Sequence, residues 1–157
     1  MSYVTNATAW LSDSINFQTK NMIAAFYELA DSSEDTGHRL STEVFSNEAT
    51  FISPSGTFHG SIEISKCREG AWSVVNLRRH ITSKAFAALV GTNTNSKTEL
   101  VLLGSVHMEF INKKTLDSPF AAHIVIGSST QALTEPRIDF MEVFSDKSRL
   151  AEVLSAR

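Results

Sequence analysis

The sequence holds a single cysteine, Cys67, among its 157 residues. One thiol cannot form an internal disulfide, and no Cys/His spacing resembles a zinc site, so we expect neither a disulfide framework nor a metal centre. Lysine and arginine are scattered along a chain of net charge −3. This charge distribution excludes the basic surface that nucleic-acid binding needs.

Long hydrophobic runs are also missing. No stretch approaches the roughly 18 apolar residues of a membrane helix, and the first residues lack the charged start and apolar centre of a signal peptide. We therefore expect a cytoplasmic protein without membrane contact. The length and the 42% hydrophobic content suit one domain over residues 1–157, preceded by a loose arm at residues 1–13.

Helical patterns occupy the first half of the chain. Apolar residues recur at helical spacing over residues 14–32, and a shorter pattern covers residues 38–45. Ser61 is a suitable N-cap for a third helix, whose apolar stripe reaches Val75. Before it, a strand at residues 48–52 and the turn sequence Ser53-Pro54-Ser55-Gly56 predict a hairpin.

The second half has the pattern of a sheet. Four β segments are expected at residues 77–90, 99–113, 119–131 and 137–146, joined by turn-rich connections, with a short helix at residues 148–156. Helices followed by an antiparallel meander predict an α+β fold.

Alternation along residues 99–113 separates two faces, because residues two apart lie on the same side of a strand. The wholly apolar row is core: Leu100, Leu102, Gly104, Val106, Met108 and Phe110. The opposite row changes from apolar to polar at His107 and Glu109. These two residues face either a pocket, or solvent and a subunit interface.

In the last strand, the same alternation places Ile138, Phe140, Glu142 and Phe144 on one face. Glu142 is the one ionisable group of that row. If the row is buried, desolvation raises the pKa of the carboxyl group and prepares it as an acid or base near neutral pH. The alternative is a structural ion pair between Glu142 and an arginine at the rim of the sheet.

Histidines offer further candidates. His80 shares a face with Arg78, Thr82 and, further along, Phe86. An imidazole titrates in the range that proton transfer requires. His123 interrupts an apolar strand. Each is either a site residue or a structural histidine. The Tyr27 hydroxyl, on the first helix, could reach a cavity while its ring packs in the core.

Several short motifs carry a family resemblance. They are Tyr27-Glu28-Leu29-Ala30-Asp31-Ser32, Phe58-His59-Gly60, Arg78-Arg79-His80 and the segment PRIDFMEVF at residues 136–144. With the order of elements, they make residues 14–150 resemble the nuclear transport factor 2-like superfamily, and within it the SnoaL-like and scytalone dehydratase-like branches.

The resemblance implies a cone-shaped, mostly antiparallel sheet wrapped around the N-terminal helices, with a central pocket. It also implies a homodimer and cofactor-free chemistry on polyketide-, terpenoid- or alkaloid-like intermediates. His80 matches a catalytic histidine of scytalone dehydratase, and Tyr27 loosely matches an oxyanion-stabilising tyrosine. The chain departs from the dehydratase pattern after the first helix, where a Glu34-Asp35 pair stands in place of an aspartate and a second pocket tyrosine is missing.

The sequence-based hypothesis is thus general acid–base catalysis by an isomerase or cyclase that needs no metal or cofactor. Glu142 or His80 would move a proton, and Arg39 or Tyr27 would stabilise charge on a substrate oxygen. Other side chains expected at the substrate are His107, His123 and Phe140. The alternatives are a dehydratase and a non-catalytic dimeric ligand-binding or adaptor module. Convergence of the three catalytic candidates on one cavity would favour an enzyme, and separate positions would favour the adaptor.

Overall fold

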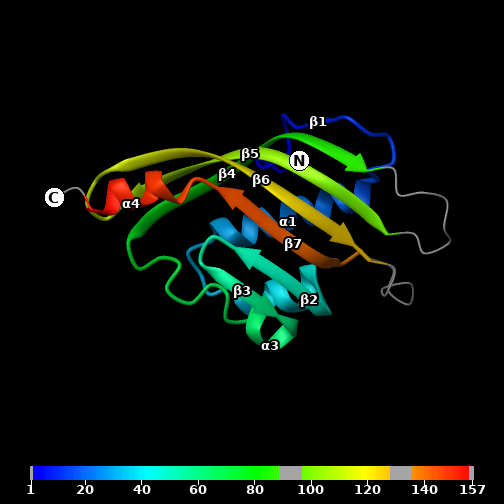
Figure 1. The fold of residues 1–157 in the computed structure, drawn as a ribbon, viewed down its shortest axis with the longest axis horizontal. Helices are drawn as coiled ribbons and strands as arrows, with labels where there is room; N and C mark the ends of the chain where they lie inside the picture. Colours follow the sequence, from blue (N-terminus) through cyan, green and yellow to red (C-terminus); the bar gives the residue numbers. More distant parts are fainter. Residues whose placement is uncertain (1, 89–96, 128–135, 156–157) are drawn as a thin grey trace.

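A computed structural model describes residues 2–88, 97–127 and 136–155. Within these residues, a curved seven-stranded sheet has the order β1-β4-β5-β6-β7-β2-β3, and α1 lies against one of its faces (Figure 1). The strands are β1 (Ala9–Trp10), β2 (Phe45–Ser53), β3 (Gly56–His59), β4 (Val75–Ala88), β5 (Thr98–Phe110), β6 (Thr115–Ile126) and β7 (Ile138–Ser145). The helices are α1 (Phe17–Asp31), α2 (Gly37–Arg39), the π-helical η1 (Leu40–Val44), α3 (Gly60–Ile64) and α4 (Lys147–Ser155).

The sheet is mostly antiparallel. The pairs β4–β5, β5–β6, β6–β7 and β2–β3 are antiparallel, whereas β1 joins β4 and β2 joins β7 in parallel. The four long segments predicted from the sequence are the four central strands. The α+β class and the sheet curved over the N-terminal helix are confirmed.

Helix α1 forms because its start is capped and one side is apolar. The Asn16 side chain accepts a hydrogen bond from the Thr19 backbone N–H at 2.8 Å, so the cap lies two residues after the beginning of the predicted range. Buried side chains recur along the helix and include Ile23, Phe26 and Tyr27. This stripe packs onto the inner face of the sheet and makes the core.

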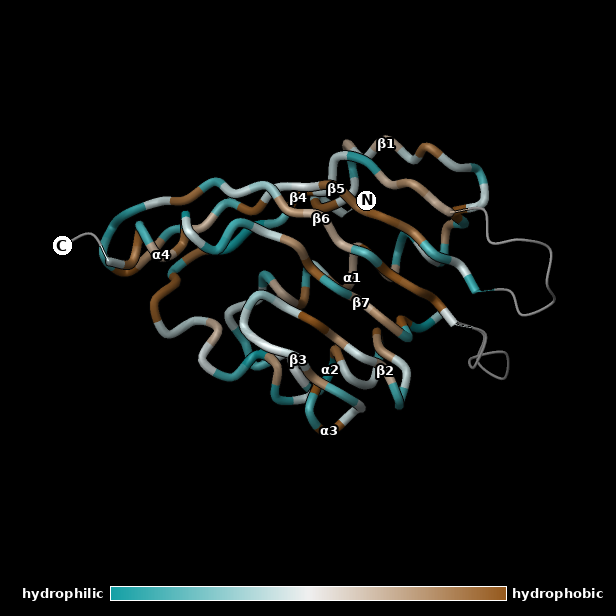
Figure 2. The backbone as a smooth tube through the Cα atoms, viewed as in Figure 1, coloured by the Kyte–Doolittle hydropathy of each residue, from teal (hydrophilic) through white to brown (hydrophobic). Residues whose placement is uncertain are grey.

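The alternation predicted for β5 is confirmed. Leu100 and Leu102 are fully buried, whereas Val101 and Leu103 are about two-fifths exposed on the outer face, at 40% and 38%. Hydrophobic segments recur along β5, β6 and β7 (Figure 2), as expected for a sheet with one face on the core.

Two predicted helices differ from the structure. The third helix ends at Ile64, not near Val75, and the following segment is a series of turns in which Gly70 has φ +70°. The left-handed backbone at Gly70 is incompatible with a continuous helix, so the helix does not extend to Val75 despite the helical spacing of its apolar residues. The second helix is one short α turn followed by η1, and β2 begins at Phe45, before the predicted strand. The predicted strand ends at residues 89–90 and 128–131 lie outside the described residues.

The N-terminal arm is not loose. Val4 is fully buried, and its carbonyl accepts a hydrogen bond from the Thr82 backbone N–H at 2.9 Å. Strand β1 then extends the sheet alongside β4. Burial of Val4 and pairing of the backbone explain why the segment is ordered.

The face assigned to β7 is wrong, because the strand contains a register shift. Val125 pairs with Phe140, yet the next residue of β6 pairs with Ile138, so Asp139 is an extra residue. Ile138 and Met141 are fully buried, whereas Phe144 is 52% exposed. One inserted residue reverses the faces of everything beyond it.

Within residues 2–88, 97–127 and 136–155, no helix is both long enough and apolar enough to cross a bilayer.

Gly104 provides a test of the inner face. A Cβ atom there would lie 2.6 Å from Cζ of Phe120 and 2.5 Å from the Ile81 carbonyl oxygen. We expect Gly104→Ala to lower the free energy of unfolding by about 1–3 kcal/mol, measured by urea denaturation. The control Ser105→Ala, on the exposed face, should change it by less than about 0.5 kcal/mol. Equal values for the two variants would contradict this packing.

Candidate active site

A cavity of about 350 Å³ lies between α1, the inner face of the sheet and the turns that follow α3. Its size falls in the range of small-molecule sites. Most of its lining is apolar, and representative residues are Phe26, Phe51, Val106, Met108, Phe120 and Val143. Polar groups therefore stand out, and the first of these is His80 on β4.

His80 forms a close pair with Asp31, the last residue of α1. The Nδ1 atom lies 2.5 Å from Oδ1 of Asp31, and the two side chains are only 17% and 5% exposed. The His80 backbone N–H also donates to Oδ2, at 2.7 Å. Helix and strand are thus joined by one carboxylate at the cavity wall.

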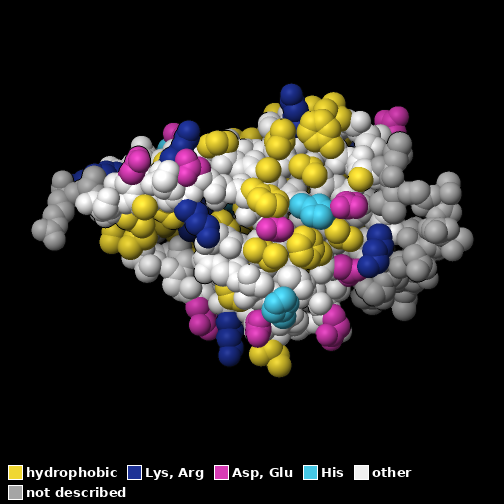
Figure 3. All heavy atoms as spheres, in the orientation of Figure 1, with side chains coloured by type: hydrophobic (Ala, Val, Ile, Leu, Met, Phe, Trp, Pro, Cys, Tyr) yellow, Lys and Arg dark blue, Asp and Glu magenta, His cyan; other side chains and the backbone are white. Residues whose placement is uncertain are grey.

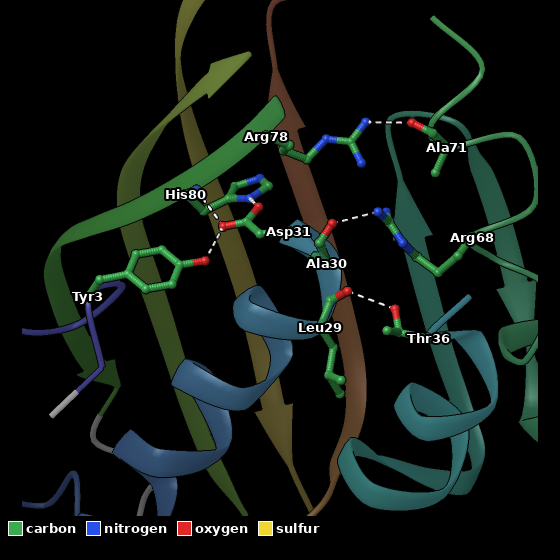
Figure 4. A network of polar contacts seen from close by, with 9 residues as sticks. All are labelled: Tyr3, Leu29, Ala30, Asp31, Thr36, Arg68, Ala71, Arg78 and His80. Atoms are coloured by element: carbon green, nitrogen blue, oxygen red, sulfur yellow. Dashed lines mark hydrogen bonds and ion pairs between the residues drawn. The ribbon is translucent and has the colours of Figure 1, made fainter. Parts of the chain in front are cut away.

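The N-terminal arm completes the hydrogen bonding of this carboxylate. The Tyr3 hydroxyl donates to Oδ2 of Asp31 at 2.8 Å (Figure 4). The Arg79 guanidinium stacks over the Tyr3 ring, 4.2 Å from its centroid. Burial, the bond to Asp31 and the nearby negative charge raise the pKa of Tyr3, so its hydroxyl remains a donor.

The pairing with Asp31 determines which ring nitrogen of His80 carries the proton. A carboxylate accepts hydrogen bonds, so Nδ1 carries the proton that points at Asp31. In the neutral ring, Nε2 is then the free proton acceptor on the side away from Asp31. The carboxylate also stabilises the imidazolium that forms when Nε2 takes a proton.

Tyr27 lies beside this pair. Its ring centroid is 5.0 Å from that of His80, and the side chain lines the cavity. The hydroxyl is buried and has no hydrogen-bond partner among the described residues. Burial, with the Asp31 charge as a smaller cause, raises the pKa of Tyr27. The group is therefore a neutral donor available to an oxygen atom in the cavity.

The structure does not bring together the three residues predicted to be catalytic. Arg39 is 58% exposed and forms an ion pair with Glu43, with Nε 2.8 Å from Oε1. Glu142 follows the register shift in β7 and lies on the outer face, paired across the ladder with His123. His80 is the member of the set that lines the cavity.

The other predicted substrate-binding residues also lie on the outer face. His107 is hydrogen-bonded to Asp117 at 2.8 Å, and that carboxylate raises the pKa of the exposed imidazole. His123 contacts Glu99 at 2.6 Å, and its ring lies 5.5 Å from that of Phe140. The choice between pocket and outer surface for His107 is thereby decided in favour of the surface.

Asp31 is the site residue that the sequence hypothesis missed. It lies in one of the motifs that carry the family resemblance, yet the position was assigned to the Glu34-Asp35 pair. Two signals were available. Asp31 follows Tyr27 by four residues, which places both on one face of a helix. An acid at a helix C-terminus also opposes the helix dipole, so it needs local donors.

Among residues 2–88, 97–127 and 136–155, no three His, Cys, Asp or Glu side chains are grouped so that they could hold a metal ion. Cys67 lines the cavity, and burial raises the pKa of its thiol to about 11. The thiol is therefore uncharged near neutral pH.

Comparisons with known proteins identify the fold. No protein-family model and no curated protein sequence matches the chain. Among solved structures, a candidate SnoaL-like polyketide cyclase from Jannaschia is 10% identical, with a TM-score of 0.65 over 93% of this chain and 97% of that one. Aln2 from Streptomyces is 11% identical, with a TM-score of 0.66 over 92% and 99%.

A candidate scytalone dehydratase from Novosphingobium aromaticivorans is 12% identical, with a TM-score of 0.63 over 81% of this chain and 80% of that one. Further solved structures with TM-scores of 0.62 are described as nuclear transport factor 2-like. The chain has the nuclear transport factor 2-like fold. In this fold, the cavity and the Asp31–His80 pair lie on the inner, concave side of the sheet.

The Asp31–His80 pair can be tested through stability. Asp31→Asn replaces a buried carboxylate that accepts three hydrogen bonds, and we expect a loss of about 1.5–3 kcal/mol in the free energy of unfolding at neutral pH. The matched control is Asp117→Asn, which removes the exposed partner of His107 and should cost less than about 1 kcal/mol. Urea denaturation of both variants measures the difference. An unchanged free energy of unfolding in Asp31→Asn would refute the buried pair.

Proposed function

We propose that the protein is a cofactor-independent isomerase or cyclase that acts by general acid–base chemistry on an apolar polycyclic natural-product intermediate. The observation that carries this proposal is the buried Asp31–His80 pair at the wall of an apolar cavity. Arg39, His80 and Glu142 do not converge on one cavity, which is the arrangement expected of the adaptor module. His80 nevertheless meets a cavity, with Asp31 as its partner, so the enzyme proposal rests on this pair.

The chemistry begins with removal of a proton. Nε2 of His80 takes a proton from a carbon next to a substrate carbonyl, and the electron pair of that C–H bond becomes an enolate. The Tyr27 hydroxyl donates to the oxygen where negative charge develops. Asp31 holds the resulting imidazolium in place.

The fate of the enolate defines the reaction. Return of the proton from Nε2 to a different carbon gives an isomer. In ring closure, the enolate carbon attacks a second carbonyl of the same molecule, the π electrons of that carbonyl move onto its oxygen, and the imidazolium protonates the resulting alkoxide. The apolar walls at Phe26, Phe51 and Phe120 suit a fused-ring substrate and keep water away from the intermediate.

Dehydration is the second candidate. If the substrate carries a hydroxyl group β to the carbonyl, the enolate expels it as the imidazolium donates its proton to the leaving oxygen, which releases water. The fold likeness to a candidate scytalone dehydratase supports this alternative. A single histidine suffices for it, because it takes the proton and then returns it to the hydroxyl group.

Hydrogen–deuterium exchange tests the proposal without knowledge of the substrate. Incubation with α-tetralone in D₂O should incorporate deuterium next to the carbonyl, which mass spectrometry detects. His80→Ala should slow the catalysed exchange about 10²-fold or more. Glu142→Gln, on the outer face, should leave the rate within about a factor of two.

Equal exchange by wild type and His80→Ala would sink the acid–base proposal, and loss of exchange in Glu142→Gln alone would restore the sequence hypothesis. A β-hydroxy derivative of the same ketone separates the two reaction types. Loss of one water mass from it identifies a dehydratase.

We also propose that the protein is a homodimer joined through the outer face of the sheet. Exposed apolar side chains on β4, β5 and β7 include Phe86, Val101, Leu103 and Phe144, which are 38–52% exposed. Figure 3 shows hydrophobic side chains gathered over the middle of this face, around a histidine flanked by acidic groups. An exposed cluster of apolar side chains of this kind typically marks a protein interface. The same surface would serve an adaptor, so it does not argue against an enzyme.

The dimer can be tested by light scattering coupled to size-exclusion chromatography. Phe144→Asp places a charge in the patch and should convert a dimer to a monomer, because an unpaired charge in an interface is costly. Phe17, at the start of α1, is 75% exposed and serves as the control position. Phe17→Asp should remain dimeric. A monomeric wild type would refute the interface.

A further inference from the structure

One wall of the cavity holds several buried hydrogen-bond donors without partners. Among the described residues, the unpartnered buried side-chain atoms are Nε of Arg68, Nη1 of Arg78, Nε1 of Trp72 and the Tyr27 hydroxyl oxygen. Arg68, Arg78 and Tyr27 line the cavity, and Trp72 follows directly on the lining residue Ala71. Every one of these four groups carries a hydrogen that it can donate. A ligand that accepts hydrogen bonds would therefore suit this wall of the cavity.

Two of the donors are cationic and lack an acidic partner. Nη2 of Arg68 donates to the Ala30 carbonyl oxygen at 2.5 Å, and Nη2 of Arg78 donates to the Ala71 carbonyl oxygen at 3.0 Å (Figure 4). These backbone bonds fix the two side chains but leave their charges in place. In the part of the chain that the structure describes, no carboxylate forms an ion pair with either guanidinium.

The Arg78 side chain is also held in place by an aromatic ring. The Arg78 guanidinium stacks on the Trp72 ring, with Cζ 5.0 Å from the ring centroid. Burial, followed by the neighbouring charge of Arg68, lowers the pKa of Arg78 to about 10, which leaves it charged at neutral pH. Two like charges held together in a buried place are unfavourable unless an anion joins them.

The charge of Asp31 partly offsets the lowering of both arginine pKa values, but among the described residues Asp31 forms its ion pair with His80 and not with either guanidinium. Its two oxygens already accept hydrogen bonds from His80 and Tyr3, including the bond from Nδ1 of the imidazole. The cavity therefore has a positive side near Arg68 and Arg78 and a separate proton-transfer pair at Asp31–His80.

We propose that Arg68 and Arg78 form an anion-binding subsite, and that the substrate carries a carboxylate group on its ring system. The inference rests on the proposed function and names the substrate class for the same cavity. A carboxylate is the acceptor whose planar geometry fits guanidinium donors.

The spacing of the two sites constrains the substrate. Arg78 and His80 lie on one strand two residues apart, so their side chains emerge on the same face roughly 7 Å from each other. A carboxylate at Arg78 would leave a ring carbon a few bonds away within reach of Nε2 of His80. The anion thus fixes the position of the carbon that loses its proton.

Binding of a matched pair of probes tests the subsite. Naphthoate and the neutral naphthamide have nearly the same shape, and isothermal titration calorimetry measures their affinity for the full chain. We expect wild type to bind naphthoate on the order of tenfold more tightly than naphthamide. Arg78→Met and Arg68→Met should each abolish that preference, whereas Lys84→Met, which removes a positive charge from the exposed outer face, should keep it.

Equal binding of the two probes by wild type, or no binding of naphthoate, would overturn the subsite, and this comparison holds even if an arginine variant fails to fold. Circular dichroism establishes folding of each variant. His80→Ala separates this proposal from the catalytic one: a variant that loses exchange but retains the naphthoate preference supports both. Exchange that survives in His80→Ala, with the preference intact, refutes the catalysis alone.

Discussion

The carboxylate of Asp31 is the interaction on which the candidate site depends. It lies at the last residue of α1, where a negative charge opposes the helix dipole. Three donors from two other segments offset this cost: the imidazole and backbone N–H of His80, and the Tyr3 hydroxyl. The helix end, a central strand and the N-terminal arm are therefore held together at the cavity. The same contacts set the tautomer of the histidine.

Different parts of the cavity lining around this carboxylate have different chemical properties. The aromatic and aliphatic walls give a dry space, the Asp31–His80 pair can move a proton, and the Tyr27 hydroxyl can stabilise an oxygen. Two buried arginines without acidic partners among the described residues supply positive charge on another side. All of these groups lie on the inner face, whereas the outer face carries apolar and paired charged side chains. The proposed catalytic site and the proposed dimer interface thus lie on opposite faces of one sheet.

Alternation predicted faces correctly where strands are regular and failed where they are not. The β5 row from Leu100 to Phe110 follows a strict period of two and was read correctly. In β7 the extra residue Asp139 moves Glu142 to the outer face. A second register shift, between Thr82 and Lys84, reverses the faces in the later part of β4. Thr82 is fully buried and Phe86 is 41% exposed, so the two do not share a face. A bulge depends on pairing with neighbouring strands, so it leaves little trace in local composition.

The sequence alone determined the α+β class, the first helix, the four long strands and the candidacy of His80 and Tyr27, because these follow from local periodicity and residue chemistry. The tertiary structure alone decided which acid meets His80, on which face Glu142 lies and that Arg68 approaches Arg78. Each of these depends on how separate segments pack together. Asp31 and His80 are 49 residues apart, and no local pattern encodes a contact between a helix end and a strand at that separation.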